Sequence, residues 1–422
     1  MKNKKCTILL CGIAAAVSLF GCAASEAPAE NNAATVAAES DTSAVTAGMG
    51  ENPLFAQGLL PVCSDNKWGY VDASGAYVIA PEYDSAGRFS ENGLAWVSND
   101  NKYGFIDTAG NEVIPFQYDS AFGFAENGLA CVSRDDQFGF IDAAGEFVIP
   151  PAFDYAIDFF PNGLSLVEKA GKYGFIDETG NYVIEPQFYS PVFFDSNGLA
   201  CVSFKDKYGL ANVPPNDKYG FIDKTGEYVI EPQFDDALGF GENRLTCVGV
   251  DGKFGYIDST GAFVIEPQFE KANPFSEGAA SVALDGRFGY IDECGEWLVK
   301  PQFDDARPFH DGVAVVEHNG RFGTIDKTGK YIVKPSRSYP FMDDVYANGL
   351  LYFKGANRKG GYLNTAGEIV IAPQFAPPPV ILFENRFFDD GYAVAMENGK
   401  MGVIDRTGAF VVPPQFDDIY PF

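Results

Sequence analysis

The sequence of 422 residues predicts an all-β protein built as a tandem array of about ten repeats, each ~35 residues long. Three observations predict this fold class. A short string recurs along the chain, turn-forming residues follow it at fixed offsets, and the strands it predicts are apolar on both faces. The abundance of Gly (46) and Pro (26) suits many tight turns better than long helices.

The recurring string is a basic residue, an aromatic residue, Gly, a second aromatic residue, Ile or Val, and Asp. It is clearest from Lys67 to Asp72 and from Lys102 to Asp107. Further copies surround six glycines, and weaker copies surround two more: Gly139, Gly174, Gly220, Gly255, Gly289 and Gly323, then Gly361 and Gly402. Most copies follow one another after 34 or 35 residues, and one gap of 46 residues contains an insertion at 207–217.

Each repeat predicts three antiparallel strands joined as a meander. In the second repeat these strands are 93–98, the string itself, and 112–114, which Pro115 ends because proline cannot donate to a ladder. The turn from Asp107 to Gly110 has the chemistry of a tight hairpin. An Asn-Gly or Asp-Gly pair then opens the next repeat, as at Asn127-Gly128.

Both faces of these strands are apolar, so each small sheet is expected to be covered on both sides by its neighbours. The Gly inside the string weakens a strand, and we expect it to admit the close approach of a neighbouring backbone or ring. Ordinary propellers have four to eight four-stranded blades. We therefore favour a stack of three-stranded units that forms an open, curved, β-solenoid-like superhelix; one or two propeller-like rings are the alternative.

The string resembles that of the WG repeat family, whose Trp-Gly pair is present literally at Trp68-Gly69. The resemblance covers residues 58–422, with units that begin near 58, 93, 128, 163, 198, 243, 278, 312, 349 and 391. It implies a non-enzymatic β-repeat protein, of a family common in bacteria and often exported. It supplies no catalytic residue.

The N-terminus predicts export. Lys2, Lys4 and Lys5 precede an apolar stretch from Cys6 to Phe20 that is too short to span a bilayer. The stretch ends in a segment, 19–22, that resembles a bacterial lipoprotein signal. This resemblance implies a signal peptide over 1–21 and a lipid on Cys22, and hence a position on the extracytoplasmic face of a bacterial cell membrane. Residues 22–57, poor in large apolar side chains, are expected to form a disordered tether.

The formal net charge of −28 repels phosphate backbones, so nucleic acid is excluded as a partner. No catalytic triad, zinc spacing or phosphate loop stands out, and neither an enzymatic activity nor a cofactor is expected. Two columns of aspartates recur, one at Asp72 and Asp107, the other at Asp84 and Asp119. They are typical of turn caps, and a ladder of weak Ca²⁺ sites stays open as the alternative.

Cysteines occupy one equivalent position at Cys131, Cys201 and Cys247, where the second repeat has Trp96. They are expected to be small core residues, although Cys201 and Cys247 could pair as a disulfide. The recurring aromatic residues are read as inter-sheet core. A stacking platform is the functional alternative, with the three tryptophans as candidate ligand-binding residues: Trp68, Trp96 and Trp297.

A motif that recurs ten times favours architecture over a single active site. We therefore expect a binding or interaction scaffold for a protein or a glycan. An envelope-associated enzyme acting on polysaccharide or cell wall, and a passive surface spacer, remain as alternatives. The enzyme would need one anomalous unit, and the ninth, Gly349–Asp390 with Arg358, Lys359 and Arg386, is the least repeat-like.

Overall fold

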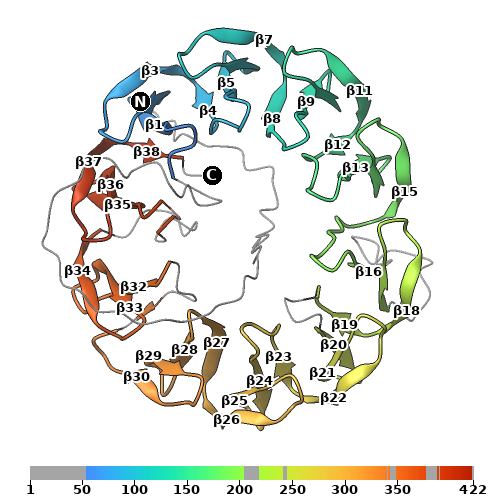
Figure 1. Ribbon diagram of the computed structural model, residues 1–422, viewed down its shortest axis with the longest axis vertical. Helices are drawn as coiled ribbons and strands as arrows, with labels where there is room; N and C mark the ends of the chain where they lie inside the picture. The colour runs from blue at the N-terminus through green and yellow to red at the C-terminus, as the bar shows by residue number, and fades with distance from the viewer. Residues whose placement is uncertain are drawn as a thin grey trace, which may run out of the picture. The chain divides into compact units, whose positions relative to one another are not determined.

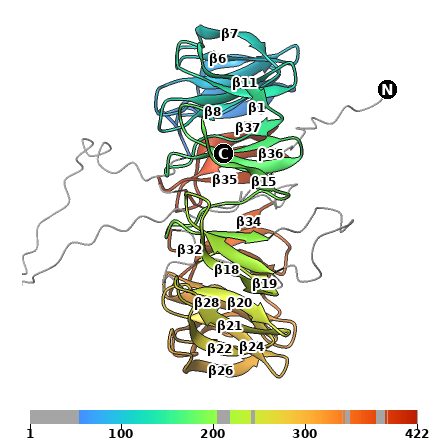
Figure 2. The same ribbon diagram turned by 90° about the vertical axis from the view of Figure 1, so that its right-hand side faces the viewer.

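The computed structural model describes residues 54–203, 218–240, 245–339, 341–342, 348–376, 387–388 and 390–420. These residues form ten small antiparallel sheets, here called blades 1 to 10, arranged side by side in a ring (Figure 1). Seen from the side, the blades lie in one layer (Figure 2). In this described part, no helix is long and apolar enough to cross a membrane.

Blades 1 to 5 follow the chain, except that blade 1 takes one strand from the C-terminus. Blade 1 contains β1 (Leu60–Ser64), β2 (Lys67–Val71), β3 (Tyr77–Tyr83) and β38 (Asp418–Ile419). Blade 2 contains β4 (Ser85–Ala86), β5 (Ala95–Asn99), β6 (Lys102–Ile106) and β7 (Glu112–Tyr118). Blade 3 contains β8 (Ser120–Phe124), β9 (Ala130–Arg134), β10 (Gln137–Ile141) and β11 (Phe147–Phe153). Blade 4 contains β12 (Tyr155–Ala156), β13 (Ser165–Lys169), β14 (Lys172–Ile176) and β15 (Tyr182–Phe188). Blade 5 contains β16 (Ala200–Ser203), β17 (Tyr219–Ile222) and β18 (Tyr228–Phe234).

Blades 6 to 10 complete the ring in the same chain order. Blade 6 contains β19 (Asp236–Ala237), β20 (Thr246–Val250), β21 (Lys253–Ile257) and β22 (Phe263–Phe269). Blade 7 contains β23 (Lys271–Ala272), β24 (Ala280–Leu284), β25 (Arg287–Ile291) and β26 (Trp297–Phe303). Blade 8 contains β27 (Asp305–His310), β28 (Val313–Glu317), β29 (Phe322–Asp326) and β30 (Tyr331–Val333). Blade 9 contains β31 (Phe341–Met342), β32 (Leu350–Lys354), β33 (Gly360–Asn364) and β34 (Ile369–Phe375). Blade 10 contains β35 (Ala393–Glu397), β36 (Lys400–Ile404) and β37 (Phe410–Phe416).

The blades have one strand more than the predicted meander. The three predicted strands are present in every blade, with the strand that follows the hairpin on the outside of the ring (Figure 1). In eight blades a fourth, usually very short strand such as β4 pairs on the inner side. It comes from the segment that sequence reasoning treated as a connection, because two residues are too few to show an alternating pattern.

The array closes, so the open superhelix is wrong and the single ring is correct. Strand β38 pairs with β1, with Ile419 opposite Val62 and Asp418 opposite Cys63. The C-terminus thereby supplies the inner strand of the first blade, and neither end of the array is left to continue. Leu54 and Phe55 lie in the core at this seam, and their backbone N–H groups donate to Asp390 Oδ2 at 2.7 and 3.3 Å. The folded region therefore begins before residue 58, inside the predicted tether.

The Gly of the recurring string sits where the outer strand bulges. Trp68 pairs with Tyr83 and Tyr70 with Ile79, so Gly69 alone faces the three outer-strand residues between them. A Cβ on Gly69 would lie 2.5 Å from the carbonyl oxygen of Ile79. In all ten strings, a Cβ added to the Gly would lie within 2.7 Å of a backbone carbonyl oxygen of the outer strand. The predicted close approach of a neighbouring backbone is confirmed.

Hydrophobic side chains from adjacent blades form the core between them. Tyr118 on β7 meets Phe147 on β11 edge-on, with ring centroids 6.0 Å apart. The seam has the same contact, since Tyr77 meets Phe416 at 5.9 Å. The hairpin Gly75 also packs against Val412 of the last blade, as Gly110 packs against Ile79. The prediction that neighbouring sheets shield each other is confirmed around the ring.

Candidate ligand-binding surface

The first column of aspartates caps the hairpins between the two outermost strands. Asp72 Oδ1 accepts hydrogen bonds from the backbone N–H and the hydroxyl of Ser74, at 2.8 and 2.6 Å, and from the N–H of Ala76 at 3.2 Å. These bonds, led by the Ser74 hydroxyl, lower the pKa of Asp72. The equivalent carboxylates accept from their own hairpins in the same way: Asp107, Asp142, Asp177, Asp223, Asp258, Asp292, Asp326 and Asp405.

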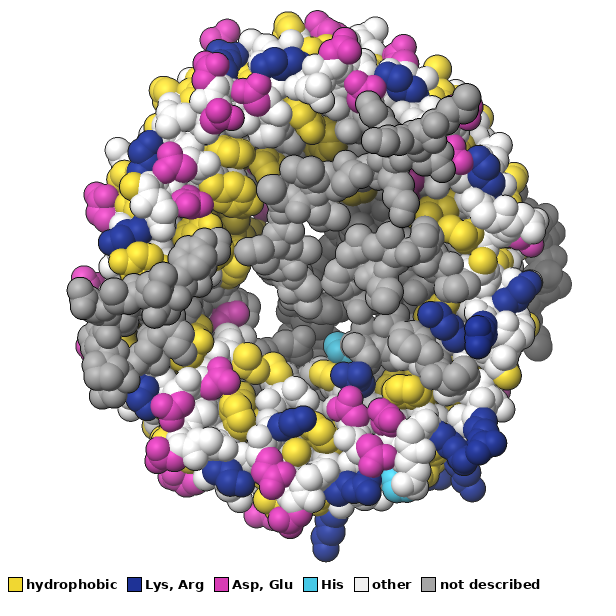
Figure 3. Space-filling view, turned by 180° about the vertical axis from the view of Figure 1, so that it is seen from behind, with side chains coloured by type: hydrophobic (Ala, Val, Ile, Leu, Met, Phe, Trp, Pro, Cys, Tyr) yellow, Lys and Arg dark blue, Asp and Glu magenta, His cyan; other side chains and the backbone are white. Residues whose placement is uncertain are grey.

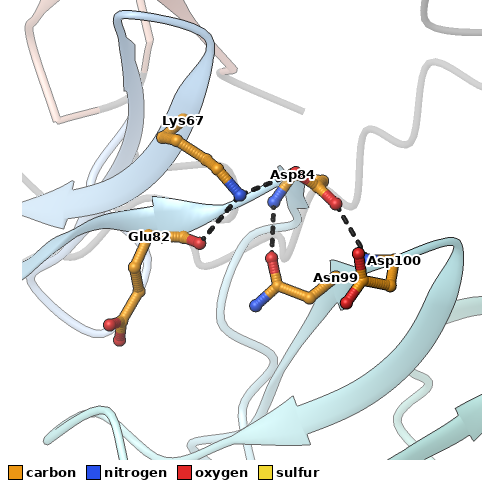
Figure 4. Close-up of polar contacts among 5 residues, drawn as sticks. All are labelled: Lys67, Glu82, Asp84, Asn99 and Asp100. Atoms are coloured by element: carbon orange, nitrogen blue, oxygen red, sulfur yellow. Dashed lines mark hydrogen bonds and ion pairs between the residues drawn. The ribbon is translucent and has the colours of Figure 1, made fainter.

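The second column joins one blade to the next. Asp84 accepts from Lys67 Nζ of blade 1 at 2.7 Å and from the backbone N–H of Asp100 in blade 2 at 2.9 Å (Figure 4). The lysine contributes most to lowering the pKa of Asp84. We call this arrangement the blade clip. Carboxylates at the equivalent position hold the N–H of the next blade's turn in the same way: Asp119, Asp154, Asp235, Glu270, Asp304 and Asp417.

Both columns are therefore occupied by contacts within the protein. Among the described residues, no group of three or more His, Cys, Asp or Glu side chains could hold a metal ion. The ladder of Ca²⁺ sites that the sequence left open has no such cluster in this part of the chain.

The three tryptophans lie in three different blades and do not converge. Trp68 is buried at the seam, edge-on to Tyr420 at 6.4 Å, and offers no open ring face. Trp96 fills the space beside Gly87, where a Cβ would lie 2.2 Å from the indole Nε1. Trp297 is one member of the inter-blade aromatic pairs and contacts Phe269 at 6.0 Å. They are better explained as core residues than as one ligand site.

The cysteines are also structural where they follow the repeat. Cys131, Cys201, Cys247 and Cys294 are free thiols, so Cys201 and Cys247 form no disulfide. The thiol of Cys131 donates to the carbonyl of Ala156 in the next blade at 3.5 Å. Burial raises the pKa of Cys201 and of Cys247 to about 12, which keeps both thiols protonated. Cys22, the predicted lipidation site, lies outside the described residues.

The ninth unit departs from the repeat for a packing reason. A Cβ on Gly360 would lie 2.4 Å from the ring of Tyr352, so the aromatic residue missing from β33 is replaced by one on β32. Arg358 lies in the turn between these strands with a positive φ of 62°. Arg386 lies outside the described residues.

Sequence variation among the blades is concentrated on the inner side of the ring. The outer strand repeats one apolar pair almost unchanged, as in Val78-Ile79 and Val113-Ile114. By contrast, the pair at the third and fourth residues after the clip position differs in each of blades 2 to 8. It reads Gly87-Arg88, Phe122-Gly123, Ile157-Asp158, Val192-Phe193, Leu238-Gly239, Asn273-Pro274 and Arg307-Pro308. We call this region the inner wall, because it adjoins or forms the innermost strands (Figure 1).

Blades 3 to 6 make the inner wall apolar. Phe122, Ile157 and Phe193 are only partly buried, and Phe193 contacts Phe160 edge-on at 6.0 Å. Leu238 is the most open of them, with 42% of its surface exposed. Hydrophobic side chains gather along the inner side of the ring in Figure 3. Blades 7, 8 and 2 present Asn273, Arg307 and Arg88 at the same level, so the wall has an apolar arc and a polar arc.

Burial raises the pKa of two carboxyl groups, Asp158 on the inner wall and Asp195 beside Gly239 of the wall. Burial raises the pKa of Asp158 to about 7, opposed only by the backbone N–H of Cys131 at 3.4 Å. Burial also raises the pKa of Asp195, whose Oδ2 accepts from the N–H of Phe240 at 2.7 Å. Both groups favour the neutral form more than ordinary aspartates do.

Ten repeated antiparallel blades, closed by a strand from the opposite end of the chain, define a β-propeller. The chain belongs to the family of WG containing repeats, which matches residues 68–103, 103–137, 138–173, 173–208, 219–254, 254–287, 288–322, 361–376 and 401–422. These segments cover more than half of the chain, and the resemblance seen at Trp68-Gly69 is confirmed.

Several solved structures are similar to this chain at low identity. One described as the eukaryotic initiation factor is 13% identical, over 86% of this chain and 96% of that chain, with a TM-score of 0.46. BamB from Moraxella catarrhalis is 12% identical, over 66% and 97%, with a TM-score of 0.32. Apo AztD from Citrobacter koseri is 12% identical, over 74% and 92%, with a TM-score of 0.31. Likeness at this level carries no argument about function. No curated protein sequence matches the chain.

Proposed function

We propose that this protein is a lipid-anchored binding scaffold on the extracytoplasmic face of a bacterial membrane, and that its ligand, a protein or a glycan, is held on the inner wall. A β-propeller of repeats fits a binding or scaffold role in general. The finer statements on anchor, location and ligand rest on the N-terminal sequence and on the inner wall.

One observation carries the choice of surface. The apolar pair of the outer strand, the hairpin aspartates and most clip carboxylates recur from blade to blade, as architecture requires, whereas the inner-wall pair differs in each of blades 2 to 8. A surface that only stacks blades has no reason to vary at this one level. A surface that binds one particular ligand needs different side chains at different blades.

The chemistry of the inner wall fits a ligand with an apolar side and a polar side. The apolar arc of blades 3 to 6 would contact the first, and side chains such as Arg88 and Arg307 would meet the second. Partly exposed aromatic rings suit both the apolar face of a sugar and the side chains of a peptide.

Two variants of blade 6 test the proposal, because Leu238 on the inner wall and Val264 on the outer strand are exposed to 42% and 44%. Leu238→Asp is expected to abolish capture of a ligand from envelope extracts or on a glycan array, while Val264→Asp retains it. Thermal melting checks that both variants fold alike. Equal loss in both variants, or in neither, would exclude the inner wall as the site.

The anchor is tested separately. Intact mass of the mature chain is expected to show acyl groups on Cys22, and Cys22→Ala is expected to lack them. A mature chain without any lipid would contradict the proposed anchor, but it would not affect the proposal that the inner wall binds the ligand. An enzyme of the cell envelope is the second candidate, and hydrolysis of a cell-wall polymer lost on changing one blade would favour it.

A further inference from the structure

The outer edge of blades 7 and 8 departs from the acidic character of the rest of the molecule. Residues 321–337 contain five basic residues and one carboxylate, in a chain whose net charge is −28. Some exposed cations of this stretch form no ion pair among the residues that the structure describes. Together with Lys300 of blade 7 they are here called the basic rim patch: Lys300, Arg321, Lys330, Lys334 and Arg337. Figure 3 shows Lys and Arg side chains gathered at the outer edge of the ring, at the lower right.

Comparison between blades shows that this patch replaces acidic residues. The outer-strand position just before the conserved proline is Glu185, Glu231 and Glu266 in blades 4 to 6. The same position is Lys300 in blade 7 and Lys334 in blade 8. The sign of the charge at one structural position therefore reverses between adjacent blades.

One cation of the patch, Arg321, lacks the clip carboxylate that most blades supply. In the blade clips, Lys67 pairs with Asp84, and Lys102 with Asp119, each seventeen residues further on. The equivalent of the lysine in blade 8 is Arg321, and the residue seventeen positions later is Ser338. The guanidinium of Arg321 thus has no carboxylate at this place, in contrast to the cations of blades 1, 2, 5, 7 and 10. Blade 4 also lacks one, and there Lys172 lies over the ring of Tyr189 instead.

We infer that the basic rim patch binds an anionic lipid surface and turns the ring edge-on to the membrane. This inference rests on the proposed lipid anchor at Cys22, which would bring the ring close to a bilayer. Each Lys or Arg next to an anionic bilayer strengthens binding by about fivefold. Leu298, 40% exposed and two residues before Lys300, adds an apolar side chain at the same edge.

Screening explains how an acidic protein can use this patch. The Debye length is about 10 Å at 0.1 M salt, so a bilayer senses the charges nearest to it and not the net charge of the ring. The glutamates of blades 4 to 6 are repelled by the same surface. Attraction at one arc and repulsion at its neighbours would together select one orientation.

The test uses the chain from residue 23 onward, which has neither leader nor anchor, with vesicles of equal parts phosphatidylglycerol and phosphatidylcholine. Cosedimentation is expected with these vesicles and not with phosphatidylcholine alone, and it should weaken as salt is raised. Lys300→Gln with Lys334→Gln is expected to weaken partitioning by tenfold or more, from about fivefold for each lysine. Lys224→Gln with Lys253→Gln removes the same charge from exposed sites of blades 5 and 6 and should change little.

Equal loss in both double variants would overturn the inference, because net charge alone would then explain the binding. So would an absence of binding to anionic vesicles, or a patch-dependent self-association of the chain in their place. The chain tested here carries no lipid, so its failure to bind vesicles would not count against the anchor at Cys22. Conversely, a mature chain found without lipid would not count against vesicle binding by the patch.

Discussion

Ile419, three residues before the last residue of the chain, pairs with Val62 in the first blade and is only 2% exposed. A residue so near the end of an open array would face solvent. Its burial follows from the pairing of β38 with β1, which joins the two ends of the array in one sheet. The stability of the protein is therefore expected to depend on its last strand.

Ile419→Ala is expected to lower the free energy of unfolding by about 2–5 kcal/mol, the range for truncating a buried isoleucine. Urea denaturation followed by tryptophan fluorescence measures this change. Val78→Ala serves as the control, because Val78 is 47% exposed and its truncation should cost less than about 0.5 kcal/mol. Equal effects in the two variants would mean that the last strand is not docked.

Gly104→Ala is expected to destabilise the protein by about 1–3 kcal/mol or more, because the new Cβ would lie 2.6 Å from the carbonyl oxygen of Ile114. The bulged outer strand cannot retreat without losing its ladder. Gly93→Ala has nothing within 4 Å and should cost only the strain of its positive φ, roughly 1 kcal/mol. Thermal melts of both variants give the comparison, and a smaller effect at Gly104 would contradict the close-approach explanation.

Asp84→Asn is expected to lower stability at neutral pH by about 1 kcal/mol or less, since both partners of the Lys67 ion pair are well exposed. The pKa of Asp84 is lowered in the folded state, so its contribution is present above its ordinary pKa and is lost as pH falls through the folded pKa. Melting curves of the variant and the native chain should therefore converge in acid. Asp100→Asn, which keeps the backbone N–H of the clip, is the control; a loss there as large as at Asp84 would argue against the clip.

Asp158→Asn is expected to stabilise the protein at pH 8 and not at pH 4. Burial raises the pKa of Asp158 from 3.8 to about 7, so between these values the folded state binds more protons than the unfolded state. Native stability should then fall as pH rises from about 4 to 7, by on the order of a few kcal/mol, and stay level above. The asparagine variant should lack this decline in melting temperature. A decline of equal size in both proteins would place its origin elsewhere.

Much of the blade could be predicted from the sequence. The string around Gly69 fixed the middle strand, and its aromatic residues do lie between blades. The need of Gly104 for a close neighbour followed from the cost of glycine in a strand. Packing on both faces followed from the lack of polar alternation. These features are local, and each leaves its mark within one period of ~35 residues.

Ring closure could not be predicted from the repeat, because the repeat length gives the size of a unit but not the rotation from one unit to the next. One signal was available. After the last outer strand, the residues from Phe416 to Ile419 repeat the pattern from Tyr83 to Ala86, an inner strand without a blade of its own. No copy of this pattern precedes the first predicted unit, which begins near residue 58, so the extra copy after the last unit matches the one missing before the first.

The packing roles of the tryptophans could not be predicted from one repeat alone. Trp297 stands where other blades have Tyr77 or Phe147, and Trp96 is large because Gly87 beside it is small. The variable inner wall was visible only after the blades showed which positions are structurally equivalent and which of them adjoin the centre of the ring.

The closed ring is tested most directly by a cross-link between its two ends. Asp418 lies directly opposite Cys63 in the seam, so Asp418→Cys places two thiols on paired residues of adjacent strands. Mild oxidation is expected to join positions 63 and 418 within one chain, as seen by mass spectrometry of a non-reduced digest, and to raise the melting temperature. A chain in which these positions stay reduced, or join only between two molecules, would contradict the ten-bladed ring.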